Sequence, residues 1–84
     1  MSSSLNHVLI GGRLTADPEP FRNGKVCRFS IACNRSMRDD SDGSWREEVS
    51  FFNCAAFNGL STRILSKLKR GNRVVVTGRL DQSR

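Results

Sequence analysis

The sequence has little of the chemistry from which enzyme sites are built. His7 is the only histidine, and the three cysteines, Cys27, Cys33 and Cys54, have no C-x-x-C spacing. A zinc site takes a full set of cysteine and histidine ligands at defined spacings, so we expect no metal and no cofactor. No nucleophile stands with a base in a recognisable constellation. We therefore predict that the chain is not an enzyme.

Long apolar runs and secretion signals are also missing. No stretch approaches the roughly 18 apolar residues of a membrane helix. The first four residues, Met-Ser-Ser-Ser, have neither the positive start nor the apolar stretch of a signal peptide. An odd number of cysteines without such a signal argues against a disulfide scaffold. These features predict a single small domain in a reducing cytoplasm, with no membrane partner.

Acidic residues are few and are concentrated in one place. The 84 residues carry 14 bases and 8 acids, and five of the acids lie between residues 39 and 48 beside a single base. The rest of the chain therefore has 13 bases against 3 acids. Such an excess is either an ordinary solvated surface or a surface for a polyanion. Because most of the bases lie in strand-like segments and not along an amphipathic helix, nucleic acid is favoured over a membrane.

Apolar alternation predicts four strands, over residues 5–15, 25–35, 47–57 and 73–80. In the second, Cys27, Phe29, Ile31 and Cys33 share one face, which is typical of a half-buried antiparallel strand. In the fourth, Val74, Val76 and Leu80 share a face. The paired glycines at 11–12 suggest a bulge or sharp bend, and Asp17-Pro18 and Asn23-Gly24 predict turns.

One helix is predicted, over residues 59–69. Leu60, Ile64 and Leu68 recur every four residues and would share one face, and Gly71 would end the helix. Residues 36–46 are polar and predict a long loop at a hairpin tip. Short antiparallel strands with one helix before the fourth match an all-β, five-stranded Greek-key barrel of the oligonucleotide/oligosaccharide-binding (OB) type. We expect one such domain over residues 1–84, with the fifth strand missing from this chain.

The stretch Val49–Phe57 carries most of the aromatic residues. Phe51, Asn53 and Phe57 share one strand face, and Phe52, Cys54 and Ala56 share the other. Both faces could be buried, one in the core and one in a subunit contact. Alternatively, one face is a platform on which bases stack, which needs cations that track the phosphates. If they lie on the same side of the sheet, Arg28, Arg73 and Arg79 would supply those cations.

Four segments in the same order resemble the bacterial single-stranded DNA-binding proteins. Asn6-His-Val-Leu-Ile-Gly-Gly-Arg-Leu-Thr-Ala-Asp-Pro-Glu19 is similar to the opening pattern N-x-V-x-L/I-x-G-x-L-x-x-D-P-E. Residues 29–35 and 48–57 resemble the family's second and third strands. Residues 68–80 fit L-x-K/R-G-x-x-V-x-V-x-G-x-L, the helix end and fourth strand.

This resemblance implies an OB barrel, assembled as a homotetramer, that wraps single-stranded DNA in replication, recombination and repair without catalysis. Phe51 and Phe57 fall at base-stacking positions. Met37 falls where many members place another aromatic residue, and it would pack more weakly on a base. Asn53 would hydrogen-bond a phosphate. Phe52 falls at a subunit contact of some members, and Trp45 aligns with no stacking position. The expected nucleic-acid-binding residues are Phe51, Phe57, Met37, Asn53, Arg28, Arg35, Arg70, Arg73 and Arg84.

The resemblance also leaves alternatives open. The chain stops at Arg84, before the family's final strand and its acidic tail, which recruits replication and repair proteins. A bacterial cytoplasmic, nucleoid-associated location follows from the family. A primosomal or regulatory OB module, which binds protein partners as much as DNA, and an RNA-binding OB module such as a translation factor remain alternatives.

Overall fold

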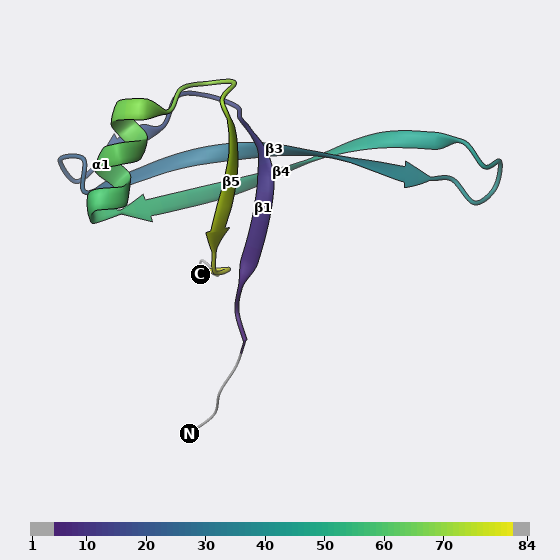
Figure 1. Cartoon of the computed structure of the whole chain (residues 1–84), viewed down its shortest axis with the longest axis horizontal. Coiled ribbons are helices and arrows are strands. Elements are labelled where there is room, and N and C mark those ends of the chain that lie inside the picture. The colour runs from purple at the N-terminus through teal and green to yellow at the C-terminus, as the bar shows by residue number, and fades with distance from the viewer. Residues whose placement is uncertain (1–4, 82–84) are drawn as a thin grey trace.

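The computed structural model describes residues 5–81, which form one antiparallel sheet and one helix (Figure 1). The elements are β1 (Val8–Leu14), β2 (Glu19–Phe21), β3 (Val26–Arg38), β4 (Trp45–Phe57), α1 (Asn58–Lys67) and β5 (Arg73–Gly78). The predicted class, β with one helix before the last strand, is thereby confirmed. The helix is too short and too polar to cross a membrane, and it is the only helix among these residues.

Strand β3 is the centre of the sheet. One edge of β3 pairs with β4 along its whole length, and the other edge pairs first with β2 and then with the end of β1. β5 joins the sheet along β1. Within the described residues β4 and β5 each pair with a single strand, so the sheet is curled but open.

The strand count predicted from the sequence was wrong by one. Residues 19–21 form the short strand β2, in a stretch where we expected only turns. Three residues with a central proline show no alternation, and proline is tolerated there because β2 pairs on one side only. The turn at Asn23-Gly24 is confirmed: the amide of Gly24 donates to the carbonyl of Phe21, and Asn23 and Gly24 both have positive φ.

The predicted loop over residues 36–46 lies at a hairpin tip as expected but is shorter than predicted, because residues 36–38 and 45–46 are paired strand. β3 and β4 continue as a two-stranded ribbon to the pair Arg38–Trp45, and only residues 39–44 form the turn. Both faces of a free ribbon meet water, so its polar side chains looked like a loop. We call residues 33–50 the hairpin arm; the arm projects well beyond the rest of the sheet (Figure 1).

The core lies between the sheet and the helix, with side chains from β1, β3, β4 and α1. It consists of Leu14, Cys27, Phe29, Ile31, Ala56 and Ile64. The alternation predicted for residues 27–31 is confirmed by this set. Val74 and Val76 also pack against the core as expected, whereas Leu80 lies beyond β5 and is exposed.

The buried face of α1 differs from the predicted one. Ser61 and Ile64 are buried and Leu65 and Leu68 pack beside them, whereas Leu60 is 57% exposed. A helix keeps one face buried when the buried residues alternate spacings of three and four, because its period is 3.6 residues. The strict four-residue step from Leu60 to Ile64 to Leu68 gradually rotates away from that face. The helix ends at Lys67, and Gly71, with φ of +87°, lies in the next turn.

The start of the helix is fastened to the β2–β3 turn. The hydroxyl of Ser61 donates to the carbonyl of Gly24 at 2.8 Å, and the amide of Asn58 donates to the carbonyl of Lys25 at 2.6 Å. Ser61 is fully buried, so its bond to Gly24 is partly shielded from water. The two bonds hold the turn against the end of β4.

We expect Ser61→Ala to lower the free energy of unfolding by about 1 kcal/mol, because the partly buried carbonyl of Gly24 loses its side-chain donor. Urea unfolding measures the change. The matched control is Ser66→Ala, since Ser66 is exposed on the same helix and bonds only locally to Arg63. If both variants lose equal stability, the Ser61 bond does not fasten the helix.

Candidate nucleic-acid interface

One face of the sheet points away from the core. Because Cys27, Phe29, Ile31 and Ala56 point inward, the even-numbered side chains of β3 and the odd-numbered side chains of β4 point outward. We call this side the outer face. It carries Phe51 and Phe57, whose exposed fractions are 67% and 60% in the single chain.

A first row of outer-face residues crosses three strands. Phe21 of β2 is opposite Val26 of β3, which is opposite Phe57 of β4. Arg28 lies one step along the same face, and its guanidinium carbon is 4.8 Å from the centroid of the Phe21 ring. That distance is a cation–π contact. The row therefore joins two aromatic rings and an arginine that remains exposed.

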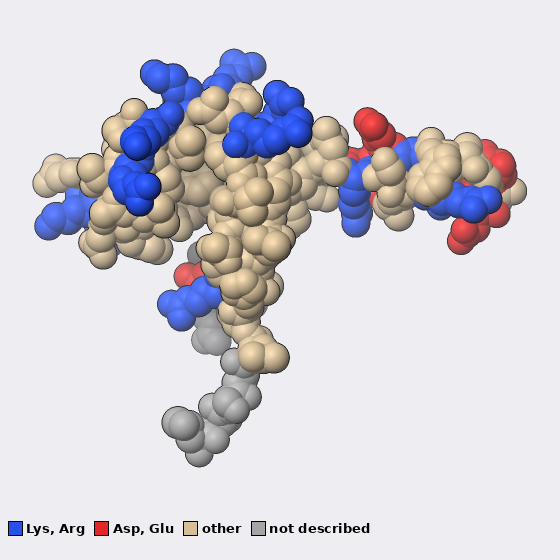
Figure 2. All heavy atoms as spheres, in the orientation of Figure 1, with Lys and Arg blue, Asp and Glu red and all other residues tan. Residues whose placement is uncertain are grey.

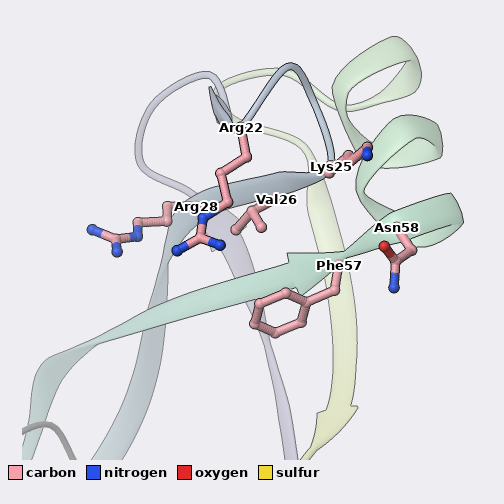
Figure 3. Close-up of a pocket in the computed structure, with 6 residues that line it drawn as sticks. All are labelled: Arg22, Lys25, Val26, Arg28, Phe57 and Asn58. Carbon is pink, nitrogen blue, oxygen red and sulfur yellow. The ribbon is translucent and has the colours of Figure 1, made fainter.

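A hollow of about 420 Å³ lies beside this row and is lined by Arg22, Lys25, Val26, Arg28, Phe57 and Asn58. Figure 3 shows Arg22 reaching from the turn over the sheet toward Phe57, with Arg28 on one side and Lys25 on the other. The three cations come from the turn and the start of β3. The hollow thus sets positive charge next to an open aromatic ring.

A second row of outer-face residues crosses four strands and includes Phe51. Arg73 of β5 is opposite Arg13 of β1, Arg13 is opposite Ala32 of β3, and Ala32 is opposite Phe51 of β4. A second hollow, of about 340 Å³, is lined by Gly11, Gly12, Arg13, Ala32, Asn34, Arg73, Val74 and Val75. Arginine and phenylalanine are again brought to one row of the outer face.

The two arginines of this row have no acidic partner in the part of the chain that is described. The one ion pair among residues 5–81 joins Arg35 and Glu48, at 3.0 Å. Like charges directly opposite on neighbouring strands are destabilising. An anion bound between Arg13 and Arg73 would offset that repulsion.

The structure brings some of the other predicted residues to the outer face and not others. Asn53 is there, opposite Ser30. Arg35 and Met37 lie on the other face of the hairpin arm, where Arg35 pairs with Glu48. Arg70 is in the loop after α1, where its amide donates to Asp17.

Three more residues from the sequence analysis are not part of the two rows. Arg84 lies outside the described residues. Phe52 points to the core side and keeps 38% of its surface exposed. Arg79 is exposed just past the end of β5.

The sequence reasoning missed two outer-face residues, Arg13 and Phe21, as well as the two turn cations of the first hollow, Arg22 and Lys25. Arg13 alternates with Gly12 and Leu14, so strand parity alone would have placed it outward. Phe21 directly precedes the Arg-Asn-Gly turn, and this turn signal would have paired it with the strand that follows. The signal was present in both cases, but neither segment was analysed for its exposed face.

Charge is separated along the molecule. In Figure 2 basic side chains cover the body around α1 and the upper ends of β1 and β5, and most visible acidic ones lie along the hairpin arm and at its tip. At the tip, Asp39 accepts hydrogen bonds from Ser41 and Asp42 accepts them from Ser44. These bonds hold the pKa of both carboxyls below the usual range. The tip therefore stays negative while the body is positive.

Comparison with known proteins identifies the family. The family model of the single-strand binding protein family matches residues 5–84. The chain belongs to this family. It is 40% identical over 85 aligned positions to the single-stranded DNA-binding protein of Treponema pallidum, covering 98% of this chain and 47% of that protein. It is 41% identical to single-stranded DNA-binding protein 2 of Chlorobaculum tepidum, covering 95% and 55%. The chain thus spans about half the length of the curated relatives it matches.

Solved structures of the family share the fold. A Plasmodium falciparum SSB in complex with ssDNA superposes with a TM-score of 0.80 at 25% identity, covering 94% of this chain and 73% of that one. The small single-stranded DNA-binding protein of Streptomyces coelicolor gives 0.73 at 28% identity, covering 94% and 74%. The expected OB-type fold and the family resemblance are confirmed.

Proposed function

We propose that this chain binds single-stranded DNA on the outer face of its sheet, without sequence preference. The observation that carries the proposal is the pairing of an exposed phenylalanine with arginine in each of two rows, at Phe57 with Arg28 and at Phe51 with Arg13 and Arg73. Family membership and the ssDNA complex of the Plasmodium relative support it.

The proposed mechanism has two parts. The arginines neutralise phosphates and release the counterions condensed on the strand, which supplies affinity that falls with salt. Phe51 and Phe57 stack on bases, and every base offers the same aromatic face, so sequence is not read. Duplex DNA binds less well because its bases already stack on one another and cannot meet the rings. Binding, and not catalysis, is therefore the activity we assign.

For the whole protein we propose the role that is general in the family. It would act in DNA replication, recombination and repair in the bacterial cytoplasm, associated with the nucleoid, as a homotetramer. The whole protein would recruit replication and repair proteins through a C-terminal tail. The further residues that would meet the strand are Met37, Asn53, Arg35, Arg70 and Arg84.

A second candidate function rests on the exposure of the same rings. Surfaces with open phenylalanines also form contacts between subunits, so the outer face would then be an oligomer interface. The unpartnered arginines of the Arg13–Arg73 row weigh against this reading, because two copies would bring more like charge together. RNA is the alternative ligand, and parallel titrations with poly(dT) and poly(U) decide between the two nucleic acids.

The expected result for the arginines concerns salt dependence. In fluorescence anisotropy titrations of labelled oligo(dT), log affinity falls linearly with log salt concentration, by about 0.7 for each phosphate neutralised. The double variant R13Q/R73Q should make this slope shallower by about 1.4, because two phosphate contacts are lost. Stability should not fall, because the variant also removes a like-charge pair.

The matched control is Arg63→Gln, which removes an exposed arginine of α1 away from the outer face. This variant should keep the wild-type slope. If R63Q and R13Q/R73Q change the salt dependence of affinity equally for each charge removed, the phosphates do not bind along the outer face. Equal binding of oligo(dT) and a duplex of the same length would contradict the proposed mechanism altogether.

A further inference from the structure

The three most exposed aromatic residues of β4 recur at equal intervals. Trp45, Phe51 and Phe57 are six residues apart, so their side chains share the outward parity. Their exposed fractions are 69%, 67% and 60%. At about 3.3 Å per residue, each interval is about 20 Å. Trp45 is thus the third ring of a regular series that runs from the helix end of the strand to the hairpin arm.

Each ring of this series has an arginine on the outer face nearby. Phe57 has Arg28 and Phe51 has Arg13, and Trp45 is directly opposite Arg38 in the register of β3 and β4. At all three rings an exposed aromatic side chain and an arginine thus share the outer face, and at Trp45 the two are directly opposite each other. From this repetition we infer that Trp45 is a third base-stacking residue, and that the bound strand follows β4 from Phe57 onto the hairpin arm. This inference rests on the proposed function.

The surroundings of Trp45 are not those of a packing residue. Trp45 stands beyond the region where β1 or β2 covers β3, so only the partner strand of the ribbon is beside it. A tryptophan that served the fold would be buried, and exposed large apolar groups commonly mark binding sites. The indole ring offers more surface for stacking than a phenyl ring, so Trp45 would allow the arm to bind a base.

The charges around Trp45 determine how its ring would contribute to DNA affinity. Asp39 and Asp42 are engaged by serines within the turn, and Glu48 is paired with Arg35. On the face of Trp45 itself the charges are Arg38 opposite and Glu47 two residues along, which offset one another. Glu47 therefore offsets part of the charge of Arg38, and what the Trp45 ring itself adds is stacking. Removing the ring should leave the salt dependence of binding unchanged.

The experiment uses the indole as its own reporter. Thymidine oligomers long enough to pass all three rings, about 40 Å of strand, are titrated into wild-type protein and W45F, and the difference in tryptophan emission is followed. Quenching should saturate together with the anisotropy of a labelled oligomer. W45A should bind this oligomer roughly 5- to 150-fold more weakly, with an unchanged salt slope. W45F should keep most of the affinity, because it keeps a ring.

Val49→Ala is the matched control, since Val49 is half exposed on the same face of the arm but has no ring. It should bind as the wild type does. Unchanged emission and unchanged affinity of W45A, while oligo(dT) still binds, would overturn the inference and leave the proposed function standing. A W45A protein that binds DNA normally but sediments as a smaller assembly would make Trp45 a contact between copies. Absence of any oligo(dT) binding would overturn both proposals.

Discussion

The double variant F51A/F57A is expected to bind oligo(dT) more weakly by about 2–6 kcal/mol, since each ring holds a base by about 1–3 kcal/mol. The two positions lie about 20 Å apart along β4, so their effects should add. Each single variant should weaken binding by about 1–3 kcal/mol. Anisotropy titrations at fixed salt measure the loss, and the salt slope should stay close to that of the wild type because no cation is removed.

The fold should survive this double change. Both rings are mostly exposed in the single chain, so their removal takes little apolar surface out of the core. Phe52→Ala is the control on the same strand, because Phe52 points to the core side. It should lower stability more than either outward variant and affect DNA affinity less. Outward variants that bind DNA normally but dissociate into smaller assemblies would establish the interface reading instead.

The second large effect is expected at Gly12, where β1 lies close against β3. A side-chain carbon at this position would overlap the carbonyl oxygen of Ala32 and lie 2.6 Å from Cγ2 of Ile31. Both neighbours are fixed, one by the backbone and one by full burial in the core. We expect Gly12→Ala to destabilise the protein by about 3 kcal/mol or more, a large part of the stability of a small domain.

Gly11 supplies the matched control for this prediction. A side-chain carbon at Gly11 would meet the Val75 methyl at 3.8 Å, an ordinary contact. Gly11→Ala should therefore change the urea midpoint little, while Gly12→Ala shifts it strongly. The paired glycines were expected to mark a bulge or bend. The structure shows instead that glycine is needed at position 12 because two strands approach closely there. Equal stability of the two variants would contradict that account.

Strands with one buried face were predictable from the sequence, and segments that meet water on both sides were not. The alternation of Cys27, Phe29 and Ile31 set the face of β3 because a core covers only one side. The hairpin arm has no core beneath it, so its polar residues were taken for a loop. β2 is too short to alternate. On α1, Ser61 was overlooked as a buried residue because its hydroxyl is satisfied by a carbonyl from another element.

The site was predictable in its aromatic part and less so in its cationic part. The parity of Phe51 and Phe57 on one strand followed from the sequence. Which arginines join them depends on the register between strands far apart in the chain. Arg13 reaches the row of Phe51 only because β1 pairs with both β3 and β5. Alternation on single strands cannot reveal such a row.

The most direct test of the account follows the phenylalanine rings themselves during binding. In protein labelled with carbon-13 in its phenylalanine rings, oligo(dT) should shift the NMR signals of Phe51 and Phe57 strongly. The signals of Phe29, which is buried in the core, should barely move. Binding that leaves Phe51 and Phe57 unshifted, or that shifts only residues off the outer face, would contradict the claim that these rings hold the bases.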